Sequence, residues 1–423
     1  MSRLVDVETH LGRILAAARD VVAAEPERTV ERVPLGAARG RVLAADVEAR
    51  ADVPPFTNSA MDGFAVRAAD LAGLPDDAIE LPVCGDVAAG AVPEPLASGT
   101  AQRIMTGAPL PDGADAIIPV EDTDHSPGPG PAPARVRIAR RAEPGACVRY
   151  RGEDVAVGDT VLTAGTVLGP AQVAAAASVG HGSLTVARMP RVLVVTTGDE
   201  LVEPGDAAAV GLIPDSNSTL LAGLVAEAGG TPVHGRSRDD VDAFRARLDE
   251  SLPEVDLVVT AGGVSAGAHE VVRQSLEGRG VEFLGVAMQP GKPQGFGTLD
   301  DGTGRRVPVV ALPGNPVSVF VAFHVLVRPL LAVLTGADPD RPTFEVVAGR
   351  DWPTPPGRRQ YAPVVVRRED GALVAEPPHA SGAKSHFAAT LGLADALAIV
   401  PADADRVAAG DRLEAFGVRG WGA

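Results

Sequence analysis

Apolar, strand-like segments run directly into turns of small residues three times between residues 192 and 320. Val192–Val195 precedes T-T-G-D-E-L, Leu257–Val259 precedes T-A-G-G-V-S-A-G, and Val307–Ala311 precedes L-P-G-N-P-V-S. Where such a turn joins a strand to a helix, backbone N–H groups and the helix N-terminus converge on one point. In a parallel sheet those points share one edge, where ligands bind. The pattern predicts an enzyme that handles a negatively charged ligand.

Helix signals are clear in several segments. Apolar spacing predicts a helix over Val5–Ala24. The residues Asp215–Asn217 supply N-caps for a helix over Ser218–Glu227, and the pair Asp239–Asp240 opens another through Leu252. Because these helices alternate with apolar strands, the segment has the βαβ pattern of a parallel sheet with right-handed crossovers.

The rest of the chain has a different pattern of apolar and turn-forming residues. Between residues 51 and 150, short apolar segments alternate with Pro and Gly, which is typical of an all-β region. Short strands and a small helix over Pro170–Ser178 flank this region, so we expect it to be an insertion. We therefore divide the chain into an N-terminal helix that packs with the α/β domain (1–26), a connecting domain (27–50 and 151–183), an inserted mainly β domain (51–150), the α/β domain (184–334) and a C-terminal β domain (335–423).

Charge and composition exclude some classes of partner. The net charge is −17 and the pI is about 4.9, which argues against nucleic acid or an anionic membrane. The most apolar stretch, Val317–Leu334, contains charged residues and a proline, so we expect a buried helix there. The two cysteines, Cys84 and Cys147, have neither disulfide nor zinc spacing. With no signal-peptide pattern at the N-terminus, these features favour a reduced, cytoplasmic setting.

The turns after the strands offer candidate ligands for an anion and candidate carboxylates for its metal counter-ion. Asp199 and Glu200 in T-T-G-D-E-L fit either helix capping or a Mg²⁺ site. The glycine-rich turn Thr260–Gly267 fits either a tight turn or a phosphate cradle. Ser318 follows the third turn, where it fits either a structural turn or an anion ligand.

A lysine between two prolines marks another anion-binding turn. The only lysines among the 38 basic residues are Lys292 and Lys384, and arginine is the default cation of this chain. Lys292 stands in P-G-K-P, whose prolines fix the local backbone. A solvated surface lysine is the ordinary interpretation, but a compact ammonium held this way suits an oxyanion.

Eight motifs occur in one order along nearly the whole chain, from about residue 5 to residue 418, and together they carry a resemblance. They are V-P-P-F-T-N-S-A-M-D-G-F-A-V-R, R-I-M-T-G-A-P-L-P-D-G-A-D-A-I-I-P-V-E, R-G-E-D-V-A-V-G-D, T-T-G-D-E-L, D-S-N-S, T-A-G-G-V-S-A-G, P-G-K-P and L-P-G-N-P-V-S. The chain resembles the molybdopterin molybdenumtransferase family, which includes the E domain of gephyrin. The resemblance implies a homodimer with a central three-layer α/β molybdopterin-binding domain, an inserted mainly β domain and a C-terminal β-barrel-like domain.

The resemblance also implies a reaction. Adenylylated molybdopterin and molybdate are the substrates, the phosphoanhydride is cleaved with release of AMP, and molybdenum enters the dithiolene to give molybdenum cofactor. Mg²⁺ is the implied metal, and transient contact with other proteins of this biosynthesis is expected.

Site residues follow from the same resemblance. The implied catalytic residues are Asp62, Asp240 and Lys292. Molybdate is expected beside Lys292, Ser318, Arg358 and Ser385, and further substrate contacts are expected from Thr106, Asp154, Gly262, Gly263, Ser265 and Pro293. Mg²⁺ and the phosphates are expected beside Asp199, Glu200, Asp240 and Glu270. Asp62, Thr106 and Asp154 are expected to complete the cleft across the dimer.

Two positions depart from the family pattern. Where the family often has an acidic pair ending in Asp, this chain keeps only Glu270, whose longer side chain shifts a metal ligand or makes it act through water. Where many members have a lysine three residues before Lys292, this chain has Gln289. The lost charge predicts weaker oxyanion binding, which Gln289→Lys is expected to tighten.

Two other functions remain open at this point. Gln289 and Glu270 favour a non-catalytic carrier or scaffold that binds molybdopterin, whereas Lys292, Asp62 and Asp240 argue against it. A molybdopterin adenylyltransferase shares a similar βαβ domain, but the inserted and C-terminal β domains favour the later, molybdenum-inserting step.

Overall fold

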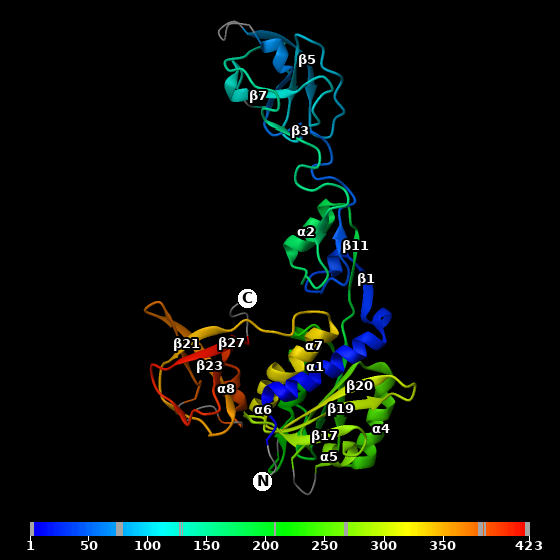
Figure 1. Cartoon of the computed structure of the whole chain (residues 1–423), viewed down its shortest axis with the longest axis vertical. Coiled ribbons are helices and arrows are strands. Elements are labelled where there is room, and N and C mark those ends of the chain that lie inside the picture. The colour runs from blue at the N-terminus through cyan, green and yellow to red at the C-terminus, as the bar shows by residue number, and fades with distance from the viewer. Residues whose placement is uncertain are drawn as a thin grey trace. The chain divides into compact units, whose positions relative to one another are not determined.

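The computed structural model describes residues 4–72, 79–126, 128, 130–206, 209–265, 270–379, 384 and 386–418. The chain forms two compact units. One contains residues 33–39 and 45–184, and the other contains residues 1–32, 40–44 and 185–423. Each unit is described by itself below, and Figure 1 gives the labels of the elements.

A six-stranded sheet is the centre of the larger unit. Its strand order is β15-β12-β16-β20-β19-β17, and the first four strands are parallel. β19 runs antiparallel to both neighbours, so the predicted parallel sheet contains one reversed strand. Only residues 301–305 join β19 to β20, and a connection this short permits only an antiparallel pair. The strands are β12 (Arg191–Thr197), β15 (Thr231–Ser237), β16 (Leu257–Ala261), β17 (Val281–Gly285), β19 (Pro293–Asp300) and β20 (Arg306–Leu312).

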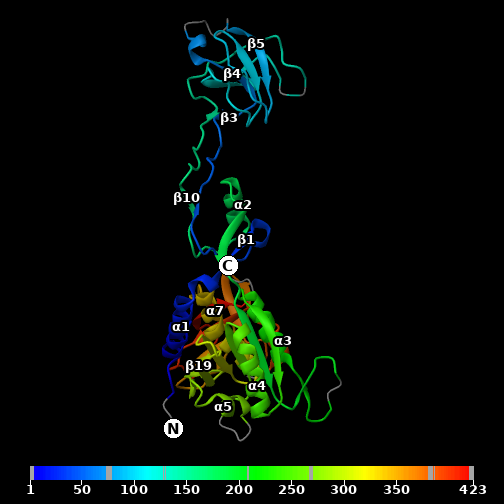
Figure 2. The ribbon, with the colours of Figure 1, turned by 90° about the vertical axis from the view of Figure 1, so that its right-hand side faces the viewer.

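Helices cover both faces of this sheet, which confirms the predicted three-layer α/β fold. Alternate residues of β12 serve the two cores, because Val192 and Val194 face one cluster while Leu193 and Val195 face the other. The predicted N-terminal helix packs in the first cluster and contacts α7 (Figures 1 and 2). The first face carries α1 (Val7–Ala24), α3 (Ser216–Glu227), α6 (Pro316–Ala322) and α7 (Arg328–Leu334), and the second carries α4 (Val241–Ser251) and α5 (Val271–Leu276).

The predicted helix caps are present. The Asp215 carboxylate accepts the Ser218 N–H at 3.1 Å at the start of α3, and the Asp240 carboxylate accepts the Ala243 N–H at 2.7 Å at the start of α4. Each bond satisfies a backbone donor that has no partner within the helix.

The apolar helix predicted near residue 317 is buried. α6 continues through a π-helical segment (Phe323–Val327) into α7. Among the described residues, Pro316–Leu334 is the one helix long and apolar enough to cross a membrane by length and composition. However, 83% of its most apolar window is buried inside the protein, where it forms part of the core.

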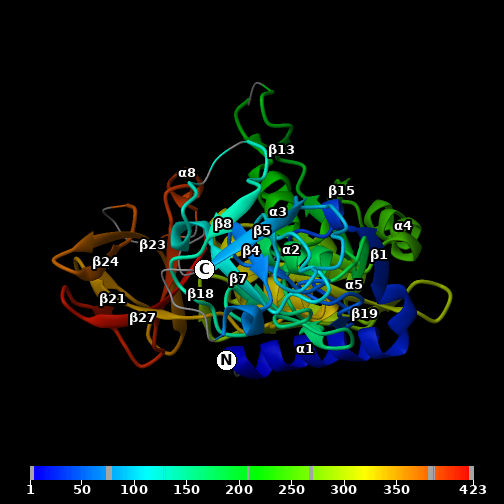
Figure 3. The same ribbon diagram turned by 90° about the horizontal axis from the view of Figure 1, so that it is seen from above.

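The C-terminal part of the larger unit is a closed barrel, as the resemblance implied. Five strands close a ring in the order β23-β24-β21-β27-β25, and β25 pairs again with β23. Figure 3 shows this barrel beside the α/β helices. β18 (Met288–Gln289) extends the barrel sheet by pairing with β23. The barrel contains β21 (Phe344–Ala348), β23 (Arg359–Glu369), β24 (Ala372–Glu376), β25 (Ala396–Val400) and β27 (Arg412–Gly417), with α8 (Ala388–Leu391) nearby in the chain.

The smaller unit is mainly β, as predicted for the inserted region. Its five-stranded sheet has the order β7-β4-β6-β5-β8 and contains short strands rich in Val, Ile and Ala. In the same unit, β2 (Val47–Glu48) pairs with β10 (Thr160–Leu162), and the helix predicted over Pro170–Ser178 is α2. The sheet strands are β4 (Gly63–Val66), β5 (Glu80–Val87), β6 (Ala101–Ile104), β7 (Ala116–Pro119) and β8 (Arg135–Arg137).

The remaining described strands are short. They are β1 (Val30–Pro34), β3 (Asn58–Ser59), β9 (Val148–Arg149), β11 (Ser183–Ala187), β13 (Leu201–Val202), β14 (Ile213–Pro214), β22 (Trp352–Pro353) and β26 (Arg406–Val407).

Candidate functional site

Three turns meet at the carboxyl edge of the α/β sheet. Gly262, after β16, has a φ of +101°, and a Cβ on it would lie 3.0 Å from the carbonyl oxygen of Thr197, the last residue of β12. A Cβ on Gly314, after β20, would lie 3.5 Å from the Cα of Gly262. The Gly262 N–H donates to the Leu312 carbonyl oxygen at 3.1 Å. Because these glycines have no side chains, the three backbones approach one another closely, and the Gly314 turn is exposed at this edge.

The glycine-rich turn continues towards α5. Gly263 has a φ of +64°, and a Cβ there would lie 3.0 Å from the Val272 nitrogen. The Ser265 N–H donates to the Glu270 carboxylate at 2.9 Å. The structure therefore brings Gly262, Gly263, Ser265 and Glu270 together in one turn, and residues 266–269 lie outside the described residues.

Two buried polar residues of D-S-N-S hold these turns, although the sequence assigned them only to helix capping. The Thr196 hydroxyl donates to the Asp215 carboxylate at 2.6 Å, and the Asn217 amide donates to the Gly314 carbonyl oxygen at 2.7 Å. Asp215 is 4% exposed and Asn217 is 9% exposed. The place of D-S-N-S among the ordered motifs is the one signal in the sequence that could have revealed this role.

The acidic turn after β12 differs from its prediction. Asp199 and Glu200 lead into the short strand β13, and the next helix begins only at Ser216. The predicted strand–turn–helix is therefore wrong at this turn, and neither acid caps a helix. The reason is that the chain first forms the parallel β13–β14 pair. It reaches Asp215, the cap of α3, only after β14.

Carboxylates from two turns approach each other at this edge. The Asp199 N–H donates to the Asp239 carboxylate at 3.3 Å, and the Asp239 N–H donates to the Asp199 carboxylate at 3.4 Å. Asp240 is adjacent, but its carboxylate caps α4. In the part of the chain that the structure describes, no three His, Cys, Asp or Glu side chains form a metal-binding group. The structure brings Asp199 close to the Asp240 turn and leaves Glu270 with Ser265.

The P-G-K-P turn lies at the same edge of the sheet. Pro293 pairs with Gly285 of β17, and two residues later Gly295 pairs with Ala311 near the carboxyl end of β20. Lys292 therefore stands just beyond the sheet at the edge where the parallel strands end. Its side chain is exposed, and no carboxylate among the described residues pairs with it.

Hydrogen bonds fix the backbone of this turn. The Val286 N–H donates to the Lys292 carbonyl oxygen at 2.8 Å. The buried Gln294 side chain donates to the Gly291 carbonyl oxygen at 2.6 Å. Lys292 is thus presented by a backbone whose shape does not depend on a bound ligand.

Arg358 reaches this turn from the C-terminal barrel. Its Nη1 donates to the Gln289 amide oxygen at 2.8 Å, immediately before P-G-K-P. Ser318 is the third residue of α6 and is 4% exposed. Ser385 lies outside the described residues. The structure therefore brings Arg358 to Gln289, the residue that immediately precedes the P-G-K-P turn of Lys292.

In the smaller unit, Asp62 and Thr106 form a pair. The Thr106 N–H donates to the Asp62 carboxylate at 2.6 Å, and its hydroxyl donates to the same oxygen at 2.8 Å. These two bonds hold the pKa of Asp62 below its ordinary value, because they stabilise the ionised form. Asp62 also lines a cavity of about 510 Å³ in this unit. Asp154 is exposed, and only its backbone makes a described bond, to Val53.

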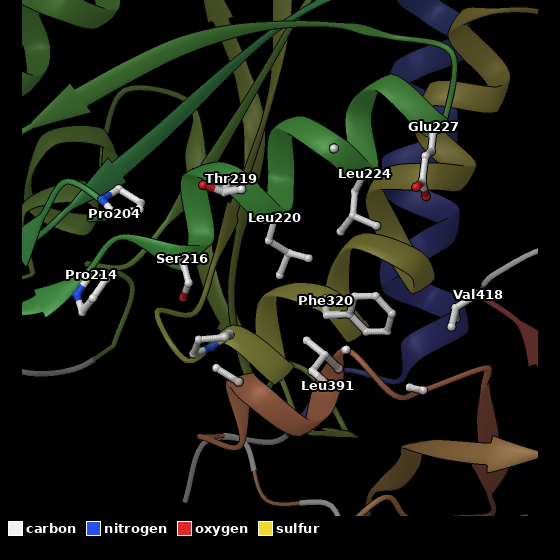
Figure 4. A pocket seen from close by; sticks show the side chains of 15 residues that line it. Pro204, Pro214, Ser216, Thr219, Leu220, Leu224, Glu227, Phe320, Leu391 and Val418 are labelled. Carbon is white, nitrogen blue, oxygen red and sulfur yellow. The ribbon is translucent and has the colours of Figure 1, made fainter. Parts of the chain in front are cut away.

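A larger cavity, of about 570 Å³, lies between α3, α6 and α8 in the larger unit (Figure 4). Its walls are mostly apolar, and Figure 4 shows Leu220, Leu224, Phe320 and Leu391 pointing into it. None of the site residues predicted from the sequence lines this cavity. The site residues predicted from the sequence therefore lie at the polar turns, outside this apolar cavity.

Comparisons with known proteins define the class first. A model of the MoeA N-terminal region (domain I and II) matches residues 5–180. A model described as a probable molybdopterin binding domain matches residues 193–333, and one of the MoeA C-terminal region (domain IV) matches residues 345–416. The converging turns of the α/β domain thus fall within the match to the molybdopterin-binding model.

Individual relatives then define the family. A Mycobacterium tuberculosis protein named molybdopterin molybdenumtransferase 2 is 43% identical over 395 residues, 91% of this chain and 94% of that protein. A Bacillus subtilis molybdopterin molybdenumtransferase is 33% identical, over 91% of this chain and 89% of its own. A crystal structure of a molybdopterin biosynthesis protein from Pyrococcus horikoshii superposes with a TM-score of 0.81 at 30% identity, covering 99% of this chain and all of that one. This chain belongs to the molybdopterin molybdenumtransferase family, whose named members are transferases of molybdenum cofactor biosynthesis.

Proposed function

We propose that this protein transfers molybdenum from molybdate to adenylylated molybdopterin, with release of AMP and formation of molybdenum cofactor. The observation that carries the proposal is the pair Lys292 and Arg358 at the P-G-K-P turn, with no carboxylate partner among the described residues. In a chain of net charge −17, two unneutralised cations at one turn form a local site for an anion.

Each turn supplies a different part of the binding site. The backbones of Gly262, Gly263 and Ser265 suit the phosphates of the pterin substrate, because backbone N–H groups at small-residue turns bind phosphate. Molybdate is a tetrahedral dianion that needs fixed cationic and hydroxyl donors, and we assign Lys292, Pro293, Ser318, Arg358 and Ser385 to its surroundings.

Lys292 is the residue assigned to charge stabilisation. Its ammonium is a compact point charge on a turn whose backbone is fixed by hydrogen bonds. A fixed cation stabilises negative charge that develops on oxygen as the bond to the AMP phosphate breaks, because the site does not have to reorganise.

Asp62 acts in the ionised form. The two bonds from Thr106 lower its pKa, so at neutral pH it accepts a proton or a ligand and does not donate a proton. We assign Asp62, Thr106 and Asp154 to the substrate as a second group, contributed within a homodimer.

The acidic turns suit a Mg²⁺ site in which the protein supplies only a few of the ligands. Mg²⁺ commonly binds one or two carboxylates together with substrate phosphates and several waters, and such a site needs no group of three acids. Asp199 and the adjacent Asp240 turn fit such a site, with Glu200 and Glu270 as the further acids assigned to the metal. When bound, Mg²⁺ neutralises phosphate charge and so assists departure of AMP.

The test is molybdate-dependent AMP release by the purified protein with adenylylated molybdopterin and Mg²⁺. Lys292→Ala is expected to lower kcat/KM for molybdate by roughly 100-fold or more, as for loss of one fixed electrostatic group. Lys292→Arg tests whether a compact ammonium is needed. Full AMP release by Lys292→Ala would contradict the assignment, and tight pterin binding without AMP release by wild type would favour a carrier.

A further inference from the structure

A strand pairing brings Gln289 near Arg358. Met288 pairs with Arg359 and Gln289 pairs with Gln360, in the parallel contact between β18 and β23. The Arg359 N–H also donates to the Ala287 carbonyl oxygen at 2.9 Å. Gln289 is therefore two positions along the strand from the residue opposite Arg358, so the backbone keeps the two residues on the same face and near each other, whatever their side chains are.

The side-chain bond in this junction leaves the arginine charged. Arg358 donates to Gln289 at 2.8 Å through one nitrogen, and no other partner of its guanidinium is found among the described residues. A guanidinium has five N–H donors, so most of its donors remain available to a ligand. The amide oxygen is neutral, so it orients the guanidinium without cancelling its charge.

We infer that Gln289 is a positioning residue that holds the Arg358 guanidinium at the oxyanion site beside Lys292. This inference rests on the proposed function. It explains the departure from the family pattern at residue 289 without a loss of function. A lysine at this position would place a second cation against Arg358, whereas glutamine accepts a hydrogen bond from it.

The inference reverses the effect expected from charge alone. If residue 289 mattered only through its charge, Gln289→Lys would tighten molybdate binding and the neutral variant Gln289→Met would leave it unchanged. If residue 289 positions Arg358, both variants weaken binding, because methionine has a similar size but no acceptor oxygen, and lysine repels the guanidinium.

The experiment measures KM for molybdate and kcat for AMP release in wild type, Gln289→Met, Gln289→Lys, Arg358→Ala and the double variant Gln289→Met with Arg358→Ala. Gln289→Met is expected to raise KM about tenfold, as for loss of a hydrogen bond to a charged group, with kcat changed less than about twofold. The double variant is expected to match Arg358→Ala, because Gln289 acts only through Arg358.

Arg359→Ala is the matched control. Arg359 is the next residue in the chain and forms an ion pair with Glu8, so its loss removes the same charge without touching Gln289. Unchanged KM in Gln289→Met, tighter binding in Gln289→Lys, or additive losses in the double variant would each overturn the inference. Absence of AMP release by wild type would instead overturn the proposed function. The two failures are distinguishable, because the wild-type assay tests the reaction and the comparison of variants tests the role of Gln289.

Discussion

Mild acid is expected to destabilise the larger unit through a buried histidine, His10. His10 lies in α1, is 0% exposed and stacks edge-on against Phe296 of β19, with ring centroids 6.2 Å apart. Both ring nitrogens lack a hydrogen-bond partner among the described residues. Burial lowers the pKa of His10 from 6.5 to about 4, and Arg13 adds to the effect.

The direction in which stability changes with pH follows from proton uptake by the unfolded chain. Below pH 6.5 the unfolded chain protonates this histidine while the folded protein does not, until the pH approaches 4. The unfolded state therefore binds more protons in this window, and stability falls as the pH falls. Between about pH 7.5 and about pH 5.5, this single group lowers the free energy of unfolding by ~1.3 kcal/mol.

The measurement is urea denaturation followed by circular dichroism at both pH values, which lie above the pI of about 4.9. His10→Leu is expected to remove ~1.3 kcal/mol of the pH dependence. His324 is a second buried histidine against which the pH dependence due to His10 can be compared. Burial, together with Arg341 and Arg328, lowers the pKa of His324 to about 3. Equal pH dependence in wild type and His10→Leu would refute the reasoning.

Two further predictions concern the proposed site. Thr106→Ala removes one of the two bonds to Asp62, so the pKa of Asp62 is expected to rise partway towards its ordinary value, measurable by carboxyl NMR titration; an unchanged pKa would contradict the role given to the hydroxyl. Asp240→Asn keeps an N-cap of similar strength while removing the charge, so it is expected to retain stability but lose AMP release, whereas Asp240→Ala also loses ~1 kcal/mol of stability. Full activity of Asp240→Asn would limit this residue to capping.

Local patterns predicted most of the fold. The spacing of apolar residues and the Asp caps located α1, α3 and α4 within a few residues, because these signals act within one or two helical turns. The strand before each glycine turn was also predicted, since a buried strand must be apolar throughout. The three-layer arrangement and the barrel followed from the family resemblance, and the structure confirms both.

What local patterns missed depends on contacts between distant residues. The turn containing Asp199 was expected to enter a helix, but β13 instead pairs with β14, a partner more than ten residues away. The bond between Gln289 and Arg358 joins residues 69 positions apart. No spacing rule connects such residues, because the backbone pairing between two domains creates the contact.

The proposed anion site depends on cations that are not neutralised by carboxylates. Arg103, Arg188 and Arg305 are partly or fully buried, and each forms an ion pair with an aspartate, so their charges are largely cancelled. Lys292 and Arg358 differ, because no carboxylate among the described residues neutralises them. An anion approaching the protein meets overall repulsion from the net charge of −17, which salt screens over about 10 Å at 0.1 M, whereas the short-range attraction at the P-G-K-P turn persists. The proposed function assigns selectivity for a small dianion to these two cations, one from each side of a domain junction, and not to the charge of the whole chain.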